Sequence, residues 1–251
     1  MENYKIIFSP TGGTQKVADI LAKEISEQWN TLDLSGQITP RTLCADDICM
    51  VAVPSFGGRV PGVAVERLQQ ISGNGAKAIL VCVYGNRAYE DTLTELQDVL
   101  TAAGFCCVAA VAAIAEHSIM HQYAAGRPDA EDVAELTAFA RQIKAQLANP
   151  VNKPLDLPGS HDTYKEYKGS SFKPQTDEKC CACGFCAKSC PVGAIDPAAP
   201  SKTDEQKCIS CMRCIAVCPR QARRLDPLMV SGAAAKMAPA FAGRKQNELF
   251  V

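Results

Sequence analysis

Apolar runs of strand length recur through the first 150 residues of the chain. The clearest of these runs cover residues 5–8, 47–53, 76–84 and 105–113, and three of the four are rich in Val and Ile. Near-continuous apolar runs of this length are typical of strands that are buried on both faces of a sheet. Residues 31–34 form a weaker candidate for a fifth strand.

Stretches with the spacing of an amphipathic helix separate these runs. In residues 15–29 the apolar side chains that fall near one helix face are Val17, Ile20, Leu21, Ile25 and Trp29. Residues 63–71, 91–103 and 129–147 have a similar pattern. Strands that alternate with helices predict an α/β fold with a doubly wound parallel sheet, which binds its ligand beyond the carboxyl ends of the strands.

The loop after the first predicted strand carries the first chemical signal. It leads directly into a helix and reads Ser9-Pro10-Thr11-Gly12-Gly13-Thr14. Backbone N–H groups at the helix start, the positive end of the helix dipole and three hydroxyl side chains together suit a phosphate group. The loop is neither a Walker A loop nor a Gly-x-Gly-x-x-Gly turn. A simple glycine turn with Thr14 as the helix N-cap is the alternative.

Two more loops fall at the same edge of the predicted sheet. They read Pro54-Ser55-Phe56-Gly57-Gly58-Arg59 and Tyr84-Gly85-Asn86-Arg87. Together the three loops resemble those of the flavodoxin family over roughly residues 1–147. The resemblance implies FMN as the ligand, with its phosphate in the first loop and its ring between the other two. Flavodoxins commonly have Thr-Gly-Asn-Thr where this chain has Thr-Gly-Gly-Thr, so one polar side chain near the phosphate is missing while the backbone donors remain.

Single side chains in these loops have candidate roles toward a flavin. Phe56 or Tyr84 would stack on the flat ring, and Arg59 and Arg87 would stabilise the negative charge of the reduced ring. Asn86 would hydrogen-bond the polar edge of the ring. The alternatives are a buried loop aromatic, solvated arginines and a turn-forming asparagine. Three residues after the last strand are candidates to cap the pocket: Glu116, His117 and Ser118.

Eight of the fourteen cysteines form two copies of one spacing, offset by 28 residues. The copies are Cys180-x2-Cys183-x2-Cys186-x3-Cys190-Pro191 and Cys208-x2-Cys211-x2-Cys214-x3-Cys218-Pro219. In runs of this kind three cysteines bind one iron–sulfur cluster, and the fourth, before proline, binds the other. The spacing therefore assigns Cys180, Cys183, Cys186 and Cys218 to a first [4Fe-4S] cluster. The ligands of the second cluster are then Cys208, Cys211, Cys214 and Cys190.

The cysteine repeat resembles the bacterial two-cluster ferredoxins over about residues 174–226, and structural zinc is the rival interpretation. The chain as a whole is similar to flavodoxin–ferredoxin fusion proteins of anaerobic bacteria, in which the second domain is a small α+β domain. Cys181 breaks the register of the repeat and is not expected to be a ligand. Because Arg220, Arg223 and Arg224 follow the second repeat, we expect the second cluster to have the higher potential.

Composition divides the chain into four segments. We expect an FMN-binding domain at 1–148, a linker rich in Pro, Gly and polar residues at 149–173 and the two-cluster domain at 174–226. Residues 227–251 form an Ala-rich tail that is expected to pack on the first domain. The cysteines outside the repeat suit a reducing compartment, and five of them are expected to be small buried side chains: Cys44, Cys49, Cys82, Cys106 and Cys107.

Charge and apolar run length bear on partners and location. A net charge of −1 without a long basic run gives no sign of nucleic-acid binding. The apolar stretches are too short to span a bilayer and no signal-peptide pattern follows Met1. These features predict a cytoplasmic protein without a membrane partner.

Two functional classes follow from this combination. An electron-transfer protein would pass electrons between the two clusters and FMN and would serve a redox protein as donor or acceptor. An FMN-dependent reductase of a small molecule would use the clusters as its electron supply. We favour the first class because no nicotinamide-binding fingerprint and no hydrolase constellation is visible. A ferredoxin with a flavin-free first domain is the third possibility.

Overall fold

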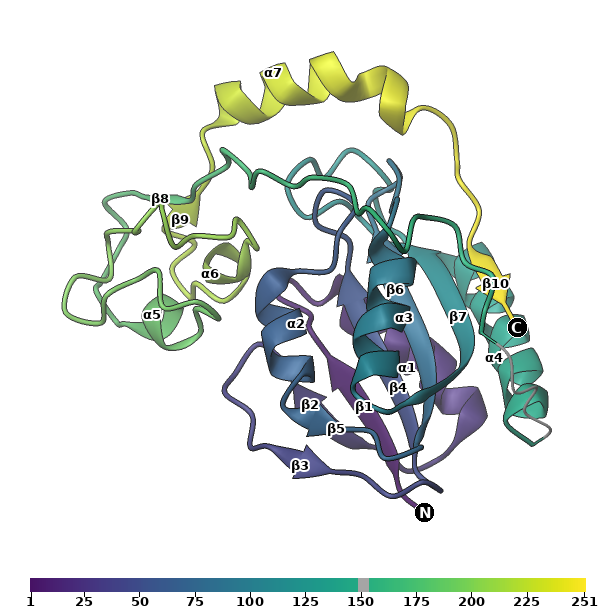
Figure 1. The fold of residues 1–251 in the computed structure, drawn as a ribbon. Helices are drawn as coiled ribbons and strands as arrows, with labels where there is room; N and C mark the ends of the chain where they lie inside the picture. The colour runs from purple at the N-terminus through teal and green to yellow at the C-terminus, as the bar shows by residue number, and fades with distance from the viewer. Residues whose placement is uncertain (149–153) are drawn as a thin grey trace.

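A six-stranded sheet forms the centre of the first domain in the computed structural model, which describes residues 1–148 and 154–251. The strand order is β10-β7-β6-β4-β1-β2 (Figure 1). Five of the strands are parallel, and all but β2 follow the clear apolar runs of the sequence: β1 (Asn3–Ile7), β2 (Asn30–Asp33), β4 (Ile48–Pro54), β6 (Lys77–Tyr84) and β7 (Cys106–Ile114). The predicted strand at 31–34 is confirmed as β2, which pairs with β1.

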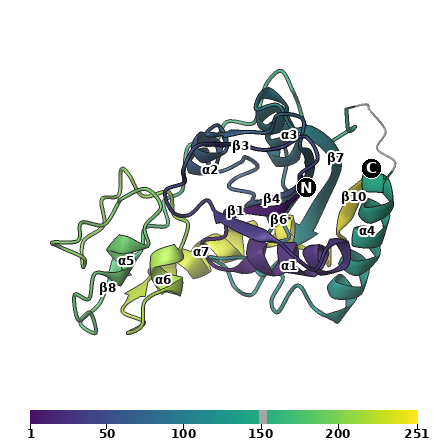
Figure 2. The same cartoon turned by 90° about the horizontal axis from the view of Figure 1, so that it is seen from below.

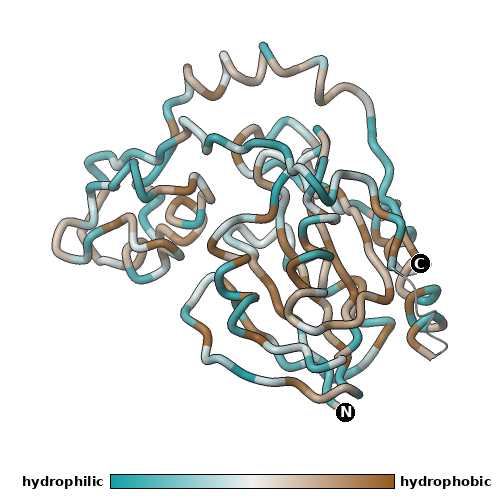
Figure 3. The backbone as a smooth tube through the Cα atoms, in the orientation of Figure 1, coloured by the Kyte–Doolittle hydropathy of each residue, from teal (hydrophilic) through white to brown (hydrophobic). Residues whose placement is uncertain are grey.

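Helices cover both faces of this sheet (Figures 1 and 2). On one face lie α1 (Gly13–Ile25) and α4 (Ala130–Ala148), and on the other α2 (Gly62–Leu68) and α3 (Thr92–Ala102). Successive strand residues alternate between the two resulting cores, as Ile6 and Ile7 do in β1. Burial on both faces explains the continuous apolar runs, which are brown in Figure 3.

The parallel strands have the order β2-β1-β4-β6-β7. This is the order of the flavodoxin-like doubly wound sheet, so the predicted fold class is confirmed. A separate pair of short parallel strands lies near the amino-terminal edge of the sheet, and it consists of β3 (Arg41–Thr42) and β5 (Ile71–Ser72).

α1 ends earlier than the apolar pattern predicts. The backbone is extended at Ser26, and Trp29 lies outside the helix. Its indole Nε1–H donates to the carbonyl oxygens of Ala22 and Ser26 at 3.1 and 3.0 Å. The last carbonyls of a helix lack intrahelical partners, so Trp29 caps α1 from outside the helix. Its ring packs against the core between the sheet and the helices α1 and α4.

The second domain is small and contains little regular structure. It consists of two short helices and one strand pair: α5 (Phe185–Lys188), α6 (Arg213–Ala216), β8 (Gln175–Thr176) and β9 (Arg223–Arg224). Val192 and Ile209 of this domain pack against the core of the first domain beneath α2 and α3. The two domains therefore share an apolar contact.

Arg67 of α2 joins the two domains from a buried position. It is 6% exposed, and its guanidinium donates to the carbonyl of Leu34 and, at 2.6 Å, to the carbonyl of Pro191. Loss of hydration on burial lowers the pKa of Arg67. A buried guanidinium is tolerated only when its N–H groups have acceptors, so these carbonyls fix Pro191, next to Cys190, against the first domain.

The described part of the linker packs along the first domain. Leu155 and Leu157 are buried in the core beneath α2 and α3. The Asp91 carboxylate accepts the backbone N–H groups of Ser160 and Lys165 at 3.1 and 2.6 Å. Residues 154–173 contain no helix or strand, yet these contacts hold them in one path. Residues 149–153 of the predicted linker lie outside the described residues.

The C-terminal segment crosses back from the second domain to the far edge of the sheet. It forms α7 (Pro227–Met237), a 3-10 turn (Ala238–Phe241) and β10 (Glu248–Phe250); in Figure 1 α7 runs across the top and β10 lies at the right, near the C-terminus. β10 is antiparallel to β7, with Leu249 opposite Val111. The second domain is thus fastened to the first through both the linker and the tail.

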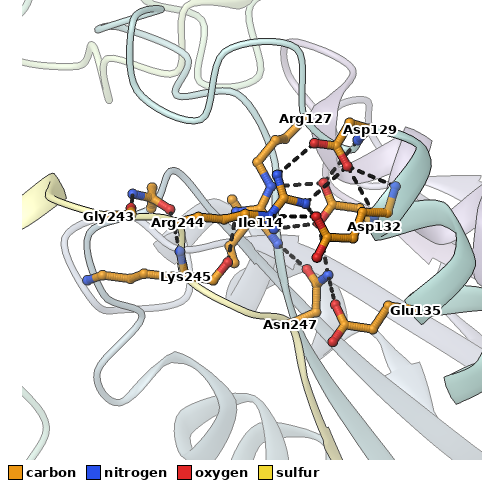
Figure 4. A network of polar contacts seen from close by, with 11 residues as sticks. Ile114, Arg127, Asp129, Asp132, Glu135, Gly243, Arg244, Lys245 and Asn247 are labelled. Carbon is orange, nitrogen blue, oxygen red and sulfur yellow. Dashed lines mark hydrogen bonds and ion pairs between the residues drawn. The ribbon is translucent and has the colours of Figure 1, made fainter.

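A buried polar network holds the tail beside β7 (Figure 4). Arg127 and Asp132 form an ion pair that is almost fully buried, with Nε donating to Oδ2 at 2.8 Å. Asn247 of the tail donates to Asp132 and accepts the N–H of Ile114 at 2.9 Å. Arg244 adds an ion pair that closes the network at the surface with Asp129, at 2.7 Å.

No helix among residues 1–148 and 154–251 combines the length and the apolar character that crossing a membrane requires.

Replacing Asp132 tests how much this network stabilises the first domain. Asp132→Ala leaves the buried Arg127 guanidinium without its carboxylate, so the free energy of unfolding should fall by about 3–5 kcal/mol. The matched control is Glu24→Ala, which removes the exposed pair with Arg141 (3.3 Å) and should cost less than about 1 kcal/mol. Urea titration followed by the fluorescence of Trp29 measures both, and equal losses would contradict the prediction.

Candidate functional site

A pocket of about 260 Å³ lies at the carboxyl ends of the parallel strands. Each of the three predicted loops contributes to its lining: Thr11, Gly13 and Thr14 after β1, Pro54, Ser55, Phe56 and Gly57 after β4, and Tyr84, Gly85 and Arg87 after β6. The segment after β7 also lines the pocket with Glu116, His117 and Ser118. Parallel strands end at one edge of a sheet, which brings these four segments together.

The loop after β1 offers open donors at the start of α1. Gly12 is the N-cap, and its φ of 93° places the backbone in the left-handed region that favours glycine. Within the described residues no protein group accepts from the N–H groups of Gly13 and Thr14. Ser9 does not line the pocket, because its Oγ accepts the N–H of Gln15 at 2.9 Å. The free N–H groups and the helix dipole fit a phosphate.

A smaller polar cavity of about 160 Å³ adjoins the same loop. Thr11 and Gly13 line both cavities. The Lys16 ammonium and the His121 imidazole line the smaller one. His121 pairs with Glu116 at 2.7 Å. Lys16 was not among the site residues expected from the sequence. Its position in the first turn of the helix after the loop is the signal that would have found it.

Arg59 and Asn86, two predicted flavin contacts, do not line the pocket. The Arg59 guanidinium donates to Glu95 at 2.7 and 2.8 Å and to the Lys165 carbonyl of the linker. Asn86 donates to the carbonyls of Phe241 and of residue 243 at 2.9 and 2.8 Å. In this structure Arg59 therefore holds the linker, and Asn86 holds the tail. Neither segment is near these loops in sequence, so local pattern gave no sign of either contact.

Arg87 lines the pocket, but its charge is paired. Both of its terminal nitrogens donate to the Glu90 carboxylate at 2.6 Å. Although burial raises the pKa of Glu90, its hydrogen bonds and ion pairs with Arg87 and Lys165 outweigh that effect and lower it. The carboxylate therefore offsets much of the charge that Arg87 presents to the pocket.

Segments distant in sequence roof the pocket. They are the linker, with Tyr167, Ser170 and Phe172, the second domain, with Ser210 and Cys211, and the tail, with Met237 and Phe241. Tyr167 lies directly on Gly57, where an added Cβ would overlap the tyrosine ring. Phe241 stacks on Tyr123 with ring centroids 4.2 Å apart. The sequence predicted that the tail packs on the first domain, but it did not indicate that tail, linker and second domain together cover this pocket.

The cysteines fall into two groups that cross the repeats. Cys180, Cys183, Cys186 and Cys218 line one cavity of the second domain. Burial, and after it the charges of Cys214, Cys190 and Cys208, raise the pKa of the Cys211 thiol to about 12. Cys190 therefore neighbours the cysteines of the second run. No group of His, Cys, Asp or Glu side chains within the described ranges is arranged to hold a single metal ion.

The second cysteine group faces the first domain. Cys211 lines the 260 Å³ pocket, and Pro191, which follows Cys190, accepts the hydrogen bond from Arg67. Arg213, next to Cys214, lies 3.8 Å from Asp33 of β2. The first group lies farther from the first domain, as Figure 1 shows for α5, which contains Cys186, relative to α6, which contains Cys214, and its Cys183 is exposed. The second group thus lies between the first group and the pocket.

Two of the three arginines after the second repeat lie beside the first cysteine group. Arg220 and Arg223 line the cavity with Cys180, Cys183, Cys186 and Cys218. The chain returns to this cavity at Cys218, so the residues that follow Cys218 lie beside it. The expectation for the potential of the second cluster assumed that these arginines lie beside that cluster. This assumption is wrong for Arg220, which lies beside the first cysteine group, whereas Arg223 also hydrogen-bonds Cys214 of the second group.

The remaining cysteines differ in burial. Cys49 and Cys82 are buried as expected, but Cys44 is exposed and Cys106 and Cys107 are half-buried. Cys181 is exposed beside Cys183, and a hydrogen bond from Arg220 is the main cause that lowers the pKa of its thiol.

Comparison with known proteins identifies a family for the cysteine-rich part of the chain. Residues 176–196 and 202–224 match the family described as 4Fe-4S binding domain. A stretch of 67 residues is 37% identical to one component of the ion-translocating oxidoreductase complex of Methanosarcina acetivorans, covering 26% of this chain and 24% of that protein. The chain thus spans about a quarter of the length of this relative.

The solved structures similar to this chain include two flavodoxins. A flavodoxin from Streptococcus pneumonia TIGR4 is 21% identical, with a TM-score of 0.41, over 57% of this chain and 99% of that chain. Oxidised Flavodoxin 1 from Bacillus cereus is 19% identical, with a TM-score of 0.43, over 60% of this chain and 99% of that chain. By its own strand order the chain has a flavodoxin-like α/β domain, and this domain is followed by a segment that matches the 4Fe-4S binding domain at residues 176–196 and 202–224.

Proposed function

We propose that this protein is an iron–sulfur flavoprotein that transfers electrons between two [4Fe-4S] clusters and FMN and serves a redox partner protein. The observation that carries this proposal is the position of Cys211. It belongs to the second cysteine group and also lines the pocket formed by the phosphate loop and the flavin loops. When bound, the clusters supply one-electron transfer and FMN links one- and two-electron chemistry.

Some residues of the chain would bind the clusters and FMN, and others would exclude water from the flavin ring. Cys180, Cys183, Cys186 and Cys218 would hold the outer cluster, and Cys190, Cys208, Cys211 and Cys214 the inner one. The N–H groups of Gly13 and Thr14 would bind the FMN phosphate. Phe56 and Tyr84 would flank the ring, while Phe172, Met237 and Phe241 keep water from it.

A second function remains in contention because the pocket has a roof. Linker, tail and second domain all cover it, so a large protein would not reach a ring bound beneath them. A small molecule that enters the pocket would then be the electron acceptor, and the chain would be an FMN-dependent reductase. Oxidation of the reduced flavin by small quinones but by no protein acceptor would favour this alternative.

Single cysteine replacements test the crossed ligand sets. Cys218→Ala should damage the outer cluster, because its cavity contains Cys218 together with three cysteines of the first run. Cys190→Ala should damage the inner one. Anaerobically prepared protein should hold about eight iron and eight sulfide per chain, and electron paramagnetic resonance should show which cluster each variant loses. Loss of the cluster of the same repeat would refute the assignment, and zinc without sulfide would refute the clusters altogether.

FMN titration tests the first domain. Thr11→Ala removes a hydroxyl that lines both cavities at the phosphate loop, and it should weaken FMN binding by about 1.5–3 kcal/mol, the value of a hydrogen bond to a charged group. Thr39→Ala, at an exposed position outside the pocket, should leave the affinity unchanged. If the wild-type protein does not bind FMN, the flavin-free interpretation replaces the proposal.

Cleavage of the two connections tests transfer within one molecule. Because linker and tail both tether the second domain, a protease cut between Lys168 and Gly169 alone should leave flavin reduction independent of protein concentration. An additional cut between Asp226 and Pro227 should make the rate depend on concentration. Rapid mixing with a reductant, followed by flavin absorbance, measures both. Concentration dependence in the uncut chain would show that electrons pass between molecules.

A further inference from the structure

Two backbone N–H groups fix the tautomer of His117. Ile119 and Met120 both donate to its Nδ1, at 3.1 and 3.0 Å. A ring nitrogen that accepts hydrogen bonds carries no proton, so the neutral ring must carry its hydrogen on Nε2. The loop after β7 thereby sets one chemical form of the side chain.

The surroundings of His117 keep the ring neutral and in place. Burial lowers its pKa to about 4, and the nearby charges of His121 and Arg87 act in the same direction. The ring lies against Gly85, where an added Cβ would come within 2.6 Å of the histidine Cδ2. Phe241 of the tail packs edge-on against it, with centroids 5.4 Å apart. At neutral pH the side chain is an uncharged, immobilised imidazole.

The Nε2–H group is left as a donor at the pocket. His117 lines the 260 Å³ pocket together with Gly85 and Tyr84. Across the described residues no protein atom accepts from Nε2, whereas Nδ1 has two partners. The side chain is half-buried and its Nε2 remains open to solvent in the pocket, so a bound ligand with an acceptor atom would replace water as its partner.

We propose that His117 is a binding residue that donates one uncharged Nε2–H hydrogen bond to an acceptor atom of the flavin ring system. The inference rests on the proposed function, because it assumes that the pocket binds FMN. The acceptor atoms of a flavin lie on its polar edge, which becomes more negative on reduction. The donor therefore binds the reduced ring more strongly than the oxidised ring, and no proton leaves the histidine.

Two isosteric replacements separate this role from a structural one. His117→Gln keeps a donor near the Nε2 position but loses the acceptor for Ile119 and Met120. His117→Asn keeps that acceptor but loses the donor to the pocket. If His117 contacts the flavin, His117→Asn should weaken the binding of reduced FMN roughly tenfold more than the binding of oxidised FMN. That difference lowers the two-electron potential by about 30 mV. His117→Gln should not produce this difference.

The experiment has readouts that do not depend on activity. Nitrogen-15 NMR of the flavin-free chain should show His117 as the Nε2–H tautomer, and spectroelectrochemistry of the loaded chain gives the flavin potential. If the flavin potential is lowered in His117→Gln and normal in His117→Asn, the inference is wrong and His117 only holds the loop after β7. Normal potentials in both variants would also overturn it. Failure of wild-type protein to bind FMN would instead overturn the proposed function, while the NMR tautomer would still test the geometry.

Discussion

The antiparallel pairing of β10 with β7 fixes the C-terminus to the far edge of the sheet, and the position of the pocket roof depends on this contact. Three residues of strand would hold weakly by themselves. The buried pair of Arg127 and Asp132, with Asn247 bonded to both Asp132 and β7, supplies the rest of the anchor. Because the tail cannot move at this end, Phe241 and Met237 are held over the pocket. β10 also becomes the edge strand in front of β7, and its three residues offer a shorter edge for pairing with other chains than the nine residues of β7 would.

The placement of the second domain depends on a different kind of contact. Arg67 has two carbonyl acceptors, one in each domain, and it is buried at the boundary. Removing its hydration is costly, so the arrangement is stable only while both carbonyls remain in reach. This couples Pro191, and with it the neighbouring Cys190, to α2 of the first domain. Val192 and Ile209 add apolar burial on the same side.

The crossing of the cysteine runs has a consequence for charge. Because Cys218 returns to the first cysteine group, the basic residues that follow it are shared unequally between the two groups, with Arg220 at the outer cavity and Arg223 near both. Sequence proximity to a repeat is therefore a poor guide to which group an arginine stabilises. Two other arginines lie close to the inner group instead. Arg67 belongs to the first domain and donates to the carbonyl of Pro191, and Arg213 belongs to the second domain and pairs with Asp33 of the first.

Local patterns determined most of the architecture. The apolar runs indicated four of the five parallel strands, since burial on both faces requires continuous apolar sequence, whereas the exposed β2 gave only a weak signal. The loops after β1, β4 and β6 converge because parallel strands end at one edge. The spacing of the cysteines likewise anticipated their crossed grouping. Only the tertiary structure placed Asn86 on the tail, Arg59 on the linker and the ring of His117 against Gly85. Each of these contacts joins segments far apart in the chain or depends on the directions of backbone N–H groups. The local sequence of residue types determines neither of these.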